Sequence, residues 1–170
     1  MARAPEAPIL LVDYDPAWPA AFERERRRLA RVLEAWLTGS IEHIGSTAVP
    51  GLRAKPVLDI MAGVESLEAS LPAIQAVARL DYVHHPYRAE VMHWFCKPSP
   101  AHRTHHLHLV PFGSALWNER LLFRDVLRRD RALAAEYAEL KTLLAQQYRN
   151  DREAYTEAKS AFVVRVLTRA

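Results

Sequence analysis

The chain has 170 residues, the size of one ordinary domain, so we expect a single domain covering residues 1–170. Half of its residues are apolar and a quarter are charged, which excludes a disordered chain, and no apolar run approaches the roughly 20 residues that span a bilayer. The net charge of +3 comes largely from stretches in which basic and acidic residues alternate at helical spacing, so a nucleic-acid partner is not expected.

The N-terminal stretch and the cysteine content indicate the compartment. The apolar run of residues 7–12 is too short for the hydrophobic region of a signal sequence. Cys96 is the single cysteine, which excludes an internal disulfide and a Cys-based zinc cage, and we expect it to be a buried, inert thiol. These features predict a cytoplasmic protein without a membrane partner.

The first predicted element is an amphipathic helix over residues 15–37. Asp15 is its candidate N-cap, and Gly39 follows its end. A short strand is predicted over residues 40–45. A loop rich in Gly and Pro then leads to a buried strand over residues 55–64.

The second half of the chain adds more strands and then only helices. A helix capped by Ser66 is predicted over residues 66–80. Three strands follow, over residues 82–87, 91–98 and 103–112. Helices are predicted from Ser114 to the end of the chain. This order predicts an α/β (α+β) fold, a mixed β-sheet covered by helices on at least one face, with a helical C-terminal third.

The loop between the first two strands contains a candidate phosphate site. Gly45 and Ser46 follow directly on a strand and open a turn at Ser46 or Thr47, whose backbone N–H groups and hydroxyls suit a phosphate. Asp59 lies inside an apolar strand, where a carboxylate requires a partner or a metal. A capped or salt-bridged structural aspartate is the alternative interpretation.

The strand over residues 103–112 carries alternating histidines. His106 and His108 point to one face, and with Asp59 they would make a two-His, one-acid set suited to Zn²⁺, Mn²⁺ or Fe²⁺. His43 is expected to join the same face from the neighbouring strand. Hydrogen-bonded or phosphate-facing histidines are the alternative.

Several basic residues are candidates to bind an anionic substrate. Lys55 lies at the start of the Asp59 strand and is expected near the Gly-Ser turn, and Lys159 is expected to reach the cleft from the last helix. Arg103 enters the histidine strand and would clamp a phosphate or carboxylate. Further candidates of the same kind are Arg53, Arg88, Lys97 and Arg124.

Four segments together resemble the GrpB family of the polymerase-beta-like nucleotidyltransferase superfamily: IEHIGSTAVPGLRAKPVLDI, HLHLV, LLFRDVLR and DREAYTEAKSAFV. The resemblance covers residues 14–167 in the right order. It implies a nucleotidyltransferase-like fold, in which a Gly-Ser turn holds nucleotide phosphates and an acid pair one residue apart carries Mg²⁺. The family is also found beside a dephospho-CoA kinase domain in one chain.

One residue departs from the superfamily pattern. The second acid would stand at position 61, where this chain has Met61, which cannot serve as a Mg²⁺ ligand. Three hypotheses follow. The first is an enzyme that transfers a nucleotidyl or phosphoryl group to a small acceptor, using Asp59, Lys55, a divalent metal (Mg, Mn or Zn) and a nucleoside triphosphate. The second is a catalytically silent module that binds a nucleotide or coenzyme A-like phosphate ester, and the third is a protein-interaction helper.

Overall fold

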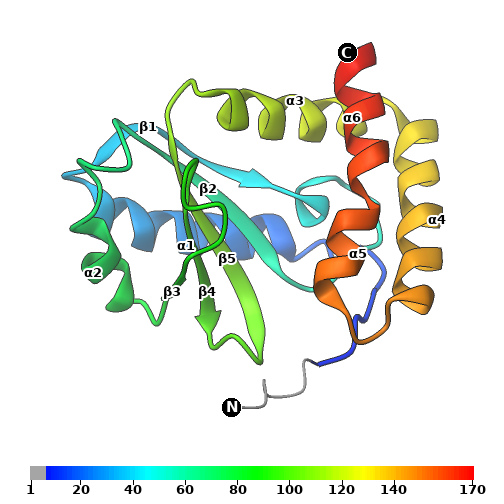
Figure 1. Ribbon diagram of the computed structural model, residues 1–170, viewed down its shortest axis with the longest axis horizontal. Coiled ribbons are helices and arrows are strands. Elements are labelled where there is room, and N and C mark those ends of the chain that lie inside the picture. Colours follow the sequence, from blue (N-terminus) through cyan, green and yellow to red (C-terminus); the bar gives the residue numbers. More distant parts are fainter. Residues whose placement is uncertain (1–6) are drawn as a thin grey trace.

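A five-stranded mixed sheet forms the centre of the computed structural model, which describes residues 7–170 (Figure 1). The first six residues, which precede the apolar run considered for a signal sequence, lie outside the described residues. The sheet order is β1-β2-β5-β4-β3. β2 and β5 are parallel, and the other neighbouring pairs are antiparallel. The strands are β1 Leu37–Ile44, β2 Leu58–Val64, β3 Val83–His85, β4 His93–Pro98 and β5 Arg103–Pro111.

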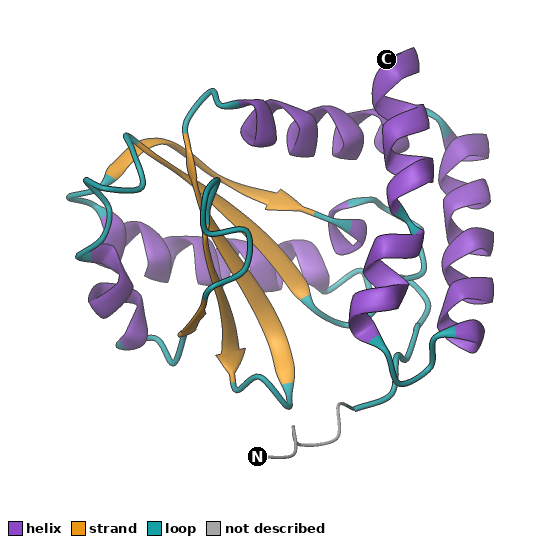
Figure 2. Cartoon of the chain, viewed as in Figure 1, coloured by secondary structure: helices purple, strands orange, loops and turns teal. Residues whose placement is uncertain are grey.

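Six α-helices and one short 3₁₀ helix, η1 (Ser46–Ala48), surround the sheet within residues 7–170 (Figure 2). The helices are α1 Trp18–Leu33, α2 Ala73–Ala78, α3 Ala115–Arg129, α4 Arg131–Gln147, α5 Arg152–Ala158 and α6 Ser160–Arg169. The predicted mixed sheet covered by helices, with a helical C-terminal third, is therefore confirmed. Within the described part of the chain, no helix is long and apolar enough to cross a membrane.

The two faces of the sheet are buried by different helices. On one face, Leu29 and Leu33 of α1 pack with Ile60 of β2 and Leu107 of β5. On the other face, Leu116 and Trp117 of α3 pack against a second apolar cluster that includes Ile44, Met61, Trp94 and the buried free thiol Cys96. Because side chains alternate along a strand, Asp59, His106 and His108 share the α3 face with Met61.

The C-terminal helices hold the loop that follows η1. Val49 and Leu52 of this loop are buried against Tyr137 of α4 and Phe162 of α6. Figure 1 shows α4, α5 and α6 gathered at the end of the sheet where β1 leads into this loop. These helices therefore fix the position of the Gly-Ser turn relative to the sheet.

Three predicted element boundaries are wrong. The first helix ends at Leu33, because β1 begins at Leu37 to pair with β2, and its N-cap is Ala17, whose N–H is bonded to Asp15 (2.8 Å). The helix predicted over residues 66–80 shrinks to α2, since Ser66 accepts a hydrogen bond within a preceding turn and Pro72 lacks a donor. The last predicted helix is broken into α5 and α6 at Lys159.

Candidate functional site

Asp59 is held by two histidines of the neighbouring parallel strand. Its Oδ1 atom lies 2.9 Å from His106 Nδ1 and 3.5 Å from His108 Nε2. Asp59 stands opposite His106 in the β2–β5 register, and His108 comes two residues later on the same face. The structure thus brings together the three residues that the strand alternation groups on one face.

The histidines keep the carboxylate ionised. Burial alone would raise the pKa of Asp59, but the His106 and His108 imidazoles, which lie close to the carboxylate and are hydrogen-bonded to it, hold this pKa well below its usual range. The Asp59 side chain remains 26% exposed, so a ligand has access to it. Burial lowers the pKa of His108 to about 4, which leaves its imidazole neutral at physiological pH.

The three residues do not form the metal site that the sequence suggested. Within residues 7–170, no group of three or more His, Cys, Asp and Glu side chains is placed to hold a metal ion. Both imidazoles direct a nitrogen at the same Asp59 oxygen. In addition, His108 Nδ1 faces the Met92 sulfur at 3.4 Å. His106 Nε2 is buried and forms no hydrogen bond with the described residues.

Met61 is a core residue. It is fully buried, opposite His108 in the β2–β5 register, and it packs in the apolar cluster beneath Leu116 and Trp117 of α3. A carboxylate at this position would be buried in this apolar cluster, with His108 and Glu42 opposite it on the two neighbouring strands. The residues present therefore do not fit the two-metal arrangement of the nucleotidyltransferase pattern.

The Gly-Ser turn lies directly against Asp59. Gly45 has a φ of +71°, and a Cβ atom at this position would lie 2.6 Å from Asp59 Oδ2, so only glycine fits. Ser46 Oγ accepts a hydrogen bond from Lys141 Nζ (2.9 Å), and Lys141 also donates to the Arg53 carbonyl. The Asp59 oxygen that is not bonded to the histidines thus faces the turn.

Thr47 is turned inward. It is 2% exposed, and its hydroxyl lies 2.9 Å from His43 Nε2 and 3.4 Å from the Val57 carbonyl. These contacts leave the backbone of Thr47, and not its side chain, for a ligand. The prediction that His43 joins the Asp59 face is wrong, because His43 stands opposite Ile60 in the β1–β2 register and stacks on Phe22 of α1.

Three lysines lie between the turn and the C-terminal helices. The Nζ atoms of Lys55 and Lys159 lie 5.2 and 4.3 Å from the centre of the buried Tyr155 ring. Lys141 is 2% exposed, and burial together with repulsion from Lys159 and Lys55 lowers its pKa to about 7. Burial and repulsion from Lys55 likewise lower the pKa of Lys159 to about 7, although Asp59 opposes this shift.

Arg120 of α3 adds a fourth cationic side chain to the three lysines. Burial lowers its pKa, while the nearby Asp59 opposes the shift. With residues 7–170 it forms no hydrogen bond or ion pair. A half-buried guanidinium without such a partner is suited to bind an anionic ligand.

Of the remaining basic candidates, one borders the site, and the others lie elsewhere or are paired with acidic residues. Arg103 lies 5.3 Å from the Trp94 ring, which in turn contacts the His106 ring at 5.0 Å, so it borders the site. Lys97 points to the opposite side and pairs with the buried Glu25. Arg53 is paired with the exposed Asp13 (2.9 Å), and Arg124 is bonded to Glu42 (2.7 Å) and Asp125 (2.7 Å).

Sequence reasoning missed Lys141, Arg120 and Tyr155. Lys141 did carry a signal, since Tyr137, Lys141 and Leu144 recur at the spacing of one buried helix face, where a lysine is out of place. Arg120 and Tyr155 stand in ordinary amphipathic helices, and only the packing of these helices brings the two residues to the pocket.

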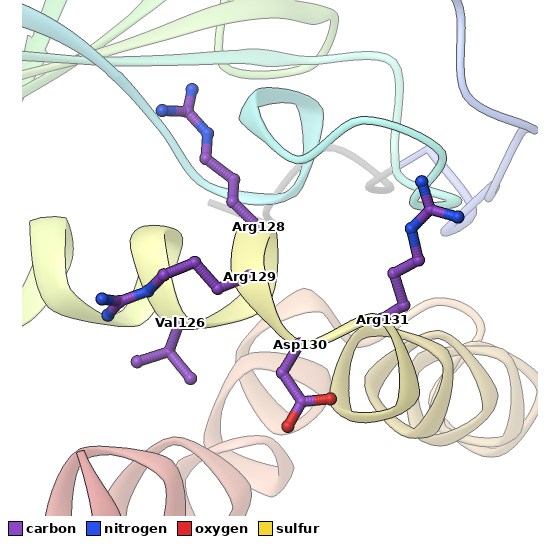
Figure 3. A pocket seen from close by; sticks show the side chains of 5 residues that line it. All are labelled: Val126, Arg128, Arg129, Asp130 and Arg131. Atoms are coloured by element: carbon purple, nitrogen blue, oxygen red, sulfur yellow. The ribbon is translucent and has the colours of Figure 1, made fainter.

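Two hollows of the surface lie away from Asp59. The larger, about 610 Å³, is lined by Val126, Arg128, Arg129, Asp130 and Arg131 at the α3–α4 junction (Figure 3). Asp130 caps α4 there (2.9 Å to the Leu133 N–H), and Arg128 Nε donates to the Ala48 carbonyl (2.8 Å). The smaller hollow, about 290 Å³, lies beside η1 and includes Glu42 and Arg124, which neutralise each other. Asp59 lines neither hollow.

The fold and the site define a mixed α/β protein in which a carboxylate and several cations lie beside a Gly-Ser turn. The family model described as GrpB protein matches residues 8–169. The chain therefore belongs to the GrpB family, as the sequence resemblance predicted.

Individual relatives agree with this assignment. A UPF0157 protein from Deinococcus radiodurans is 42% identical over 161 residues, which cover 94% of this chain and 81% of that protein. The crystal structure of conserved protein GrpB from Enterococcus faecalis matches with a TM-score of 0.84 and 32% identity, covering 94% of this chain and 96% of that chain. A dephospho-CoA kinase from Mycolicibacterium paratuberculosis is 29% identical over an alignment that covers 90% of this chain and 44% of the kinase.

Proposed function

We propose that this GrpB chain binds a nucleotide or a coenzyme A-like phosphate ester in the Asp59 pocket. The observation that carries the proposal is the convergence of Lys55, Lys141 and Lys159, together with Arg120, beside the Gly45-Ser46 turn. Asp59 is the one carboxylate among the described groups that shift the pKa values of Lys141 and Lys159. The pocket therefore has an excess of positive charge that a polyanion would neutralise.

The electrostatics of the lysines favour an anionic ligand. Both lowered lysine pKa values arise from burial and from repulsion by neighbouring cations. A phosphate group placed between the ammonium groups would offset this repulsion and accept hydrogen bonds from them. The Gly-Ser turn would contribute backbone N–H donors to the same phosphate.

A relative's name supports a ligand of this class. The matched relative is named a dephospho-CoA kinase, and the alignment covers 44% of it. The similarity thus favours a nucleotide-like or coenzyme-like phosphate ester over an unrelated anion.

Transfer of a nucleotidyl or phosphoryl group, as in the nucleotidyltransferase superfamily, is the second candidate. It is favoured by the position of Asp59 Oδ2, which faces the turn while Oδ1 is bonded to the histidines. In this hypothesis Asp59 would orient the reacting group and Lys55 would offset negative charge in the transition state. A divalent metal stays a prediction for the ligand-bound state, where the phosphates would supply most of its oxygen ligands.

Calorimetry and thermal unfolding with ATP and with coenzyme A, each in EDTA and then in Mg²⁺ or Mn²⁺, test the proposal. A ligand at a hundred times its Kd raises the free energy of unfolding by about 2.7 kcal/mol. We expect such stabilisation in EDTA, a clear loss of it in Lys159→Gln and Arg120→Gln, and no loss in Arg27→Gln, an exposed change on α1. Absence of binding by both ligands in all metal conditions would refute the proposal. Release of diphosphate or ADP over a long incubation, abolished in Asp59→Asn, would establish transfer.

A further inference from the structure

An exposed aromatic side chain lies at the edge of the Asp59 pocket. Tyr87 belongs to the connection between β3 and β4, which Figure 1 shows as a green loop in front of the sheet. The residue is 46% exposed. Nearly half of its surface is therefore open to solvent.

Ring contacts connect Tyr87 to the site. The Tyr87 ring packs edge-on against Trp94 at 5.9 Å, and Trp94 packs against His106 at 5.0 Å. His106 is in turn hydrogen-bonded to Asp59. Trp94 is 8% exposed, so the Tyr87 ring packs against a buried neighbour while much of its own surface stays exposed.

A second observation places Tyr87 near the same site. Tyr87 and the neighbouring Arg88 lie close enough to Arg120 of α3 to affect its pKa, as does Asp59. The β3–β4 connection therefore lies near Arg120, while Lys55 and Lys159 lie near Tyr155.

We infer that Tyr87 is the stacking platform for the base of the ligand, with the outer face of its ring against the nucleobase. This inference rests on the proposed binding of a phosphate ester at Asp59, and it narrows the ligand to one that carries an aromatic base. Stacking on a rigidly held ring suits any base, because every base presents a π-face. The phosphates would then lie among Arg120 and the lysines.

Two probes separate the base from the phosphates: ATP and inorganic tripolyphosphate, each titrated calorimetrically in EDTA. For Tyr87→Ala we expect ATP affinity to fall about tenfold or more and tripolyphosphate affinity to stay unchanged. Tyr87→Phe keeps the ring and should keep the affinity for ATP. Phe112→Ala is the matched control, since Phe112 is also half-exposed (51%) and packs edge-on against a tryptophan (Trp117, 5.1 Å), but at the far end of β5.

The outcomes are distinguishable. An equal loss for both probes in Tyr87→Ala, or no loss for either, overturns the stacking role while the phosphate pocket stands. If the unmodified chain binds tripolyphosphate and ATP equally tightly, stacking is again overturned. Failure of both probes to bind overturns the stacking role together with the proposed function. Because Tyr87 is exposed, we expect Tyr87→Ala to unfold at the same temperature as the unmodified chain. Measuring the unfolding temperature of each variant checks that it is folded.

Discussion

Gly45 and Asp59 approach each other so closely that a side chain at Gly45 would collide with the carboxylate. A Cβ atom at Gly45 would lie 2.6 Å from Asp59 Oδ2 and 3.0 Å from Asp59 Cβ. The turn that precedes η1 and the strand that carries Asp59 are therefore fitted to one another, and the carboxylate is presented to the backbone of the turn. This contact is the structural basis of the Gly-Ser…Asp spacing in the sequence.

The close approach of Gly45 to Asp59 predicts that Gly45→Ala costs more stability than Gly51→Ala. Gly51 has a similar φ of +79°, but a Cβ atom there would meet no atom within 4 Å. Gly51→Ala should cost only the backbone strain, roughly 1–3 kcal/mol, whereas Gly45→Ala should cost clearly more because it adds the collision with Asp59. Urea unfolding of both variants measures the difference. Equal losses of stability would show that the turn can move away from Asp59.

Strand alternation and loop spacing were sufficient to predict the central part of the site. His106 and His108 share a face because side chains alternate along a strand, which is local to the sequence, and the parallel pairing of β2 with β5 brings Asp59 to the same face. The register of antiparallel β1 was less predictable. It shifts between Leu37 and Ile41 and places His43 opposite Ile60, on the other face from Asp59.

The cations were harder to predict because helix packing, rather than strand periodicity, brings them to the pocket. Lys141 is separated from its partner Ser46 by 95 residues, and the contact depends on how α4 packs against the loop after η1. The sequence predicted that Lys159 reaches the cleft. It did not predict the break between α5 and α6 at this residue, because the amphipathic pattern continues through it. Sequence pattern thus fixes the elements better than it fixes their mutual placement.

The burial of Met61 predicts that a carboxylate at position 61 would destabilise the fold. Met61→Asp would bury a carboxylate among Trp117, Leu116 and Ile44, and we expect a loss of about 3 kcal/mol or more in the free energy of unfolding. Met61→Leu conserves volume and should cost less than about 1.5 kcal/mol. Urea unfolding measures both, and Mg²⁺ titration of Met61→Asp checks for metal binding. A stable Met61→Asp variant that binds Mg²⁺ tightly would show that the scaffold retains a metal-ready geometry.

The buried pair of Glu25 and Lys97 predicts strong coupling on the other face of the sheet. Both side chains are at least 91% buried, and Glu25 also accepts a hydrogen bond from Tyr82 (3.0 Å) and pairs with Arg28 of α1 (3.0 Å). Glu25→Leu leaves the buried Lys97 unpaired and should cost about 3–5 kcal/mol, whereas Lys97→Met should cost less because Arg28 still pairs with Glu25. The double variant should cost less than the sum of the two. Additive losses in this double-mutant cycle would mean that the two charges do not interact.

The lowered pKa values of Lys141 and Lys159 predict that ligand binding takes up protons. In the unfolded chain a lysine titrates near 10.5, whereas Lys141 and Lys159 titrate at about 7 in the fold, so between these values the unfolded chain binds more protons. Stability should therefore rise with pH from about 7 to 10. A polyanion favours the charged lysines, so its binding should consume protons and weaken as the pH rises above 7.

Calorimetry of ATP binding at pH 8 in HEPES and in Tris separates this coupling from the binding enthalpy, because the two buffers release protons with different enthalpies. We expect proton uptake by the unmodified chain, a smaller uptake in Lys159→Met, and an unchanged uptake in Arg27→Gln, whose side chain is 70% exposed on α1. The rise of stability between pH 7 and 10 should likewise be smaller in Lys159→Met. Binding with no proton uptake at pH 8 would mean that the phosphates do not contact Lys141 and Lys159, and would move the ligand to the Arg120 side of the pocket.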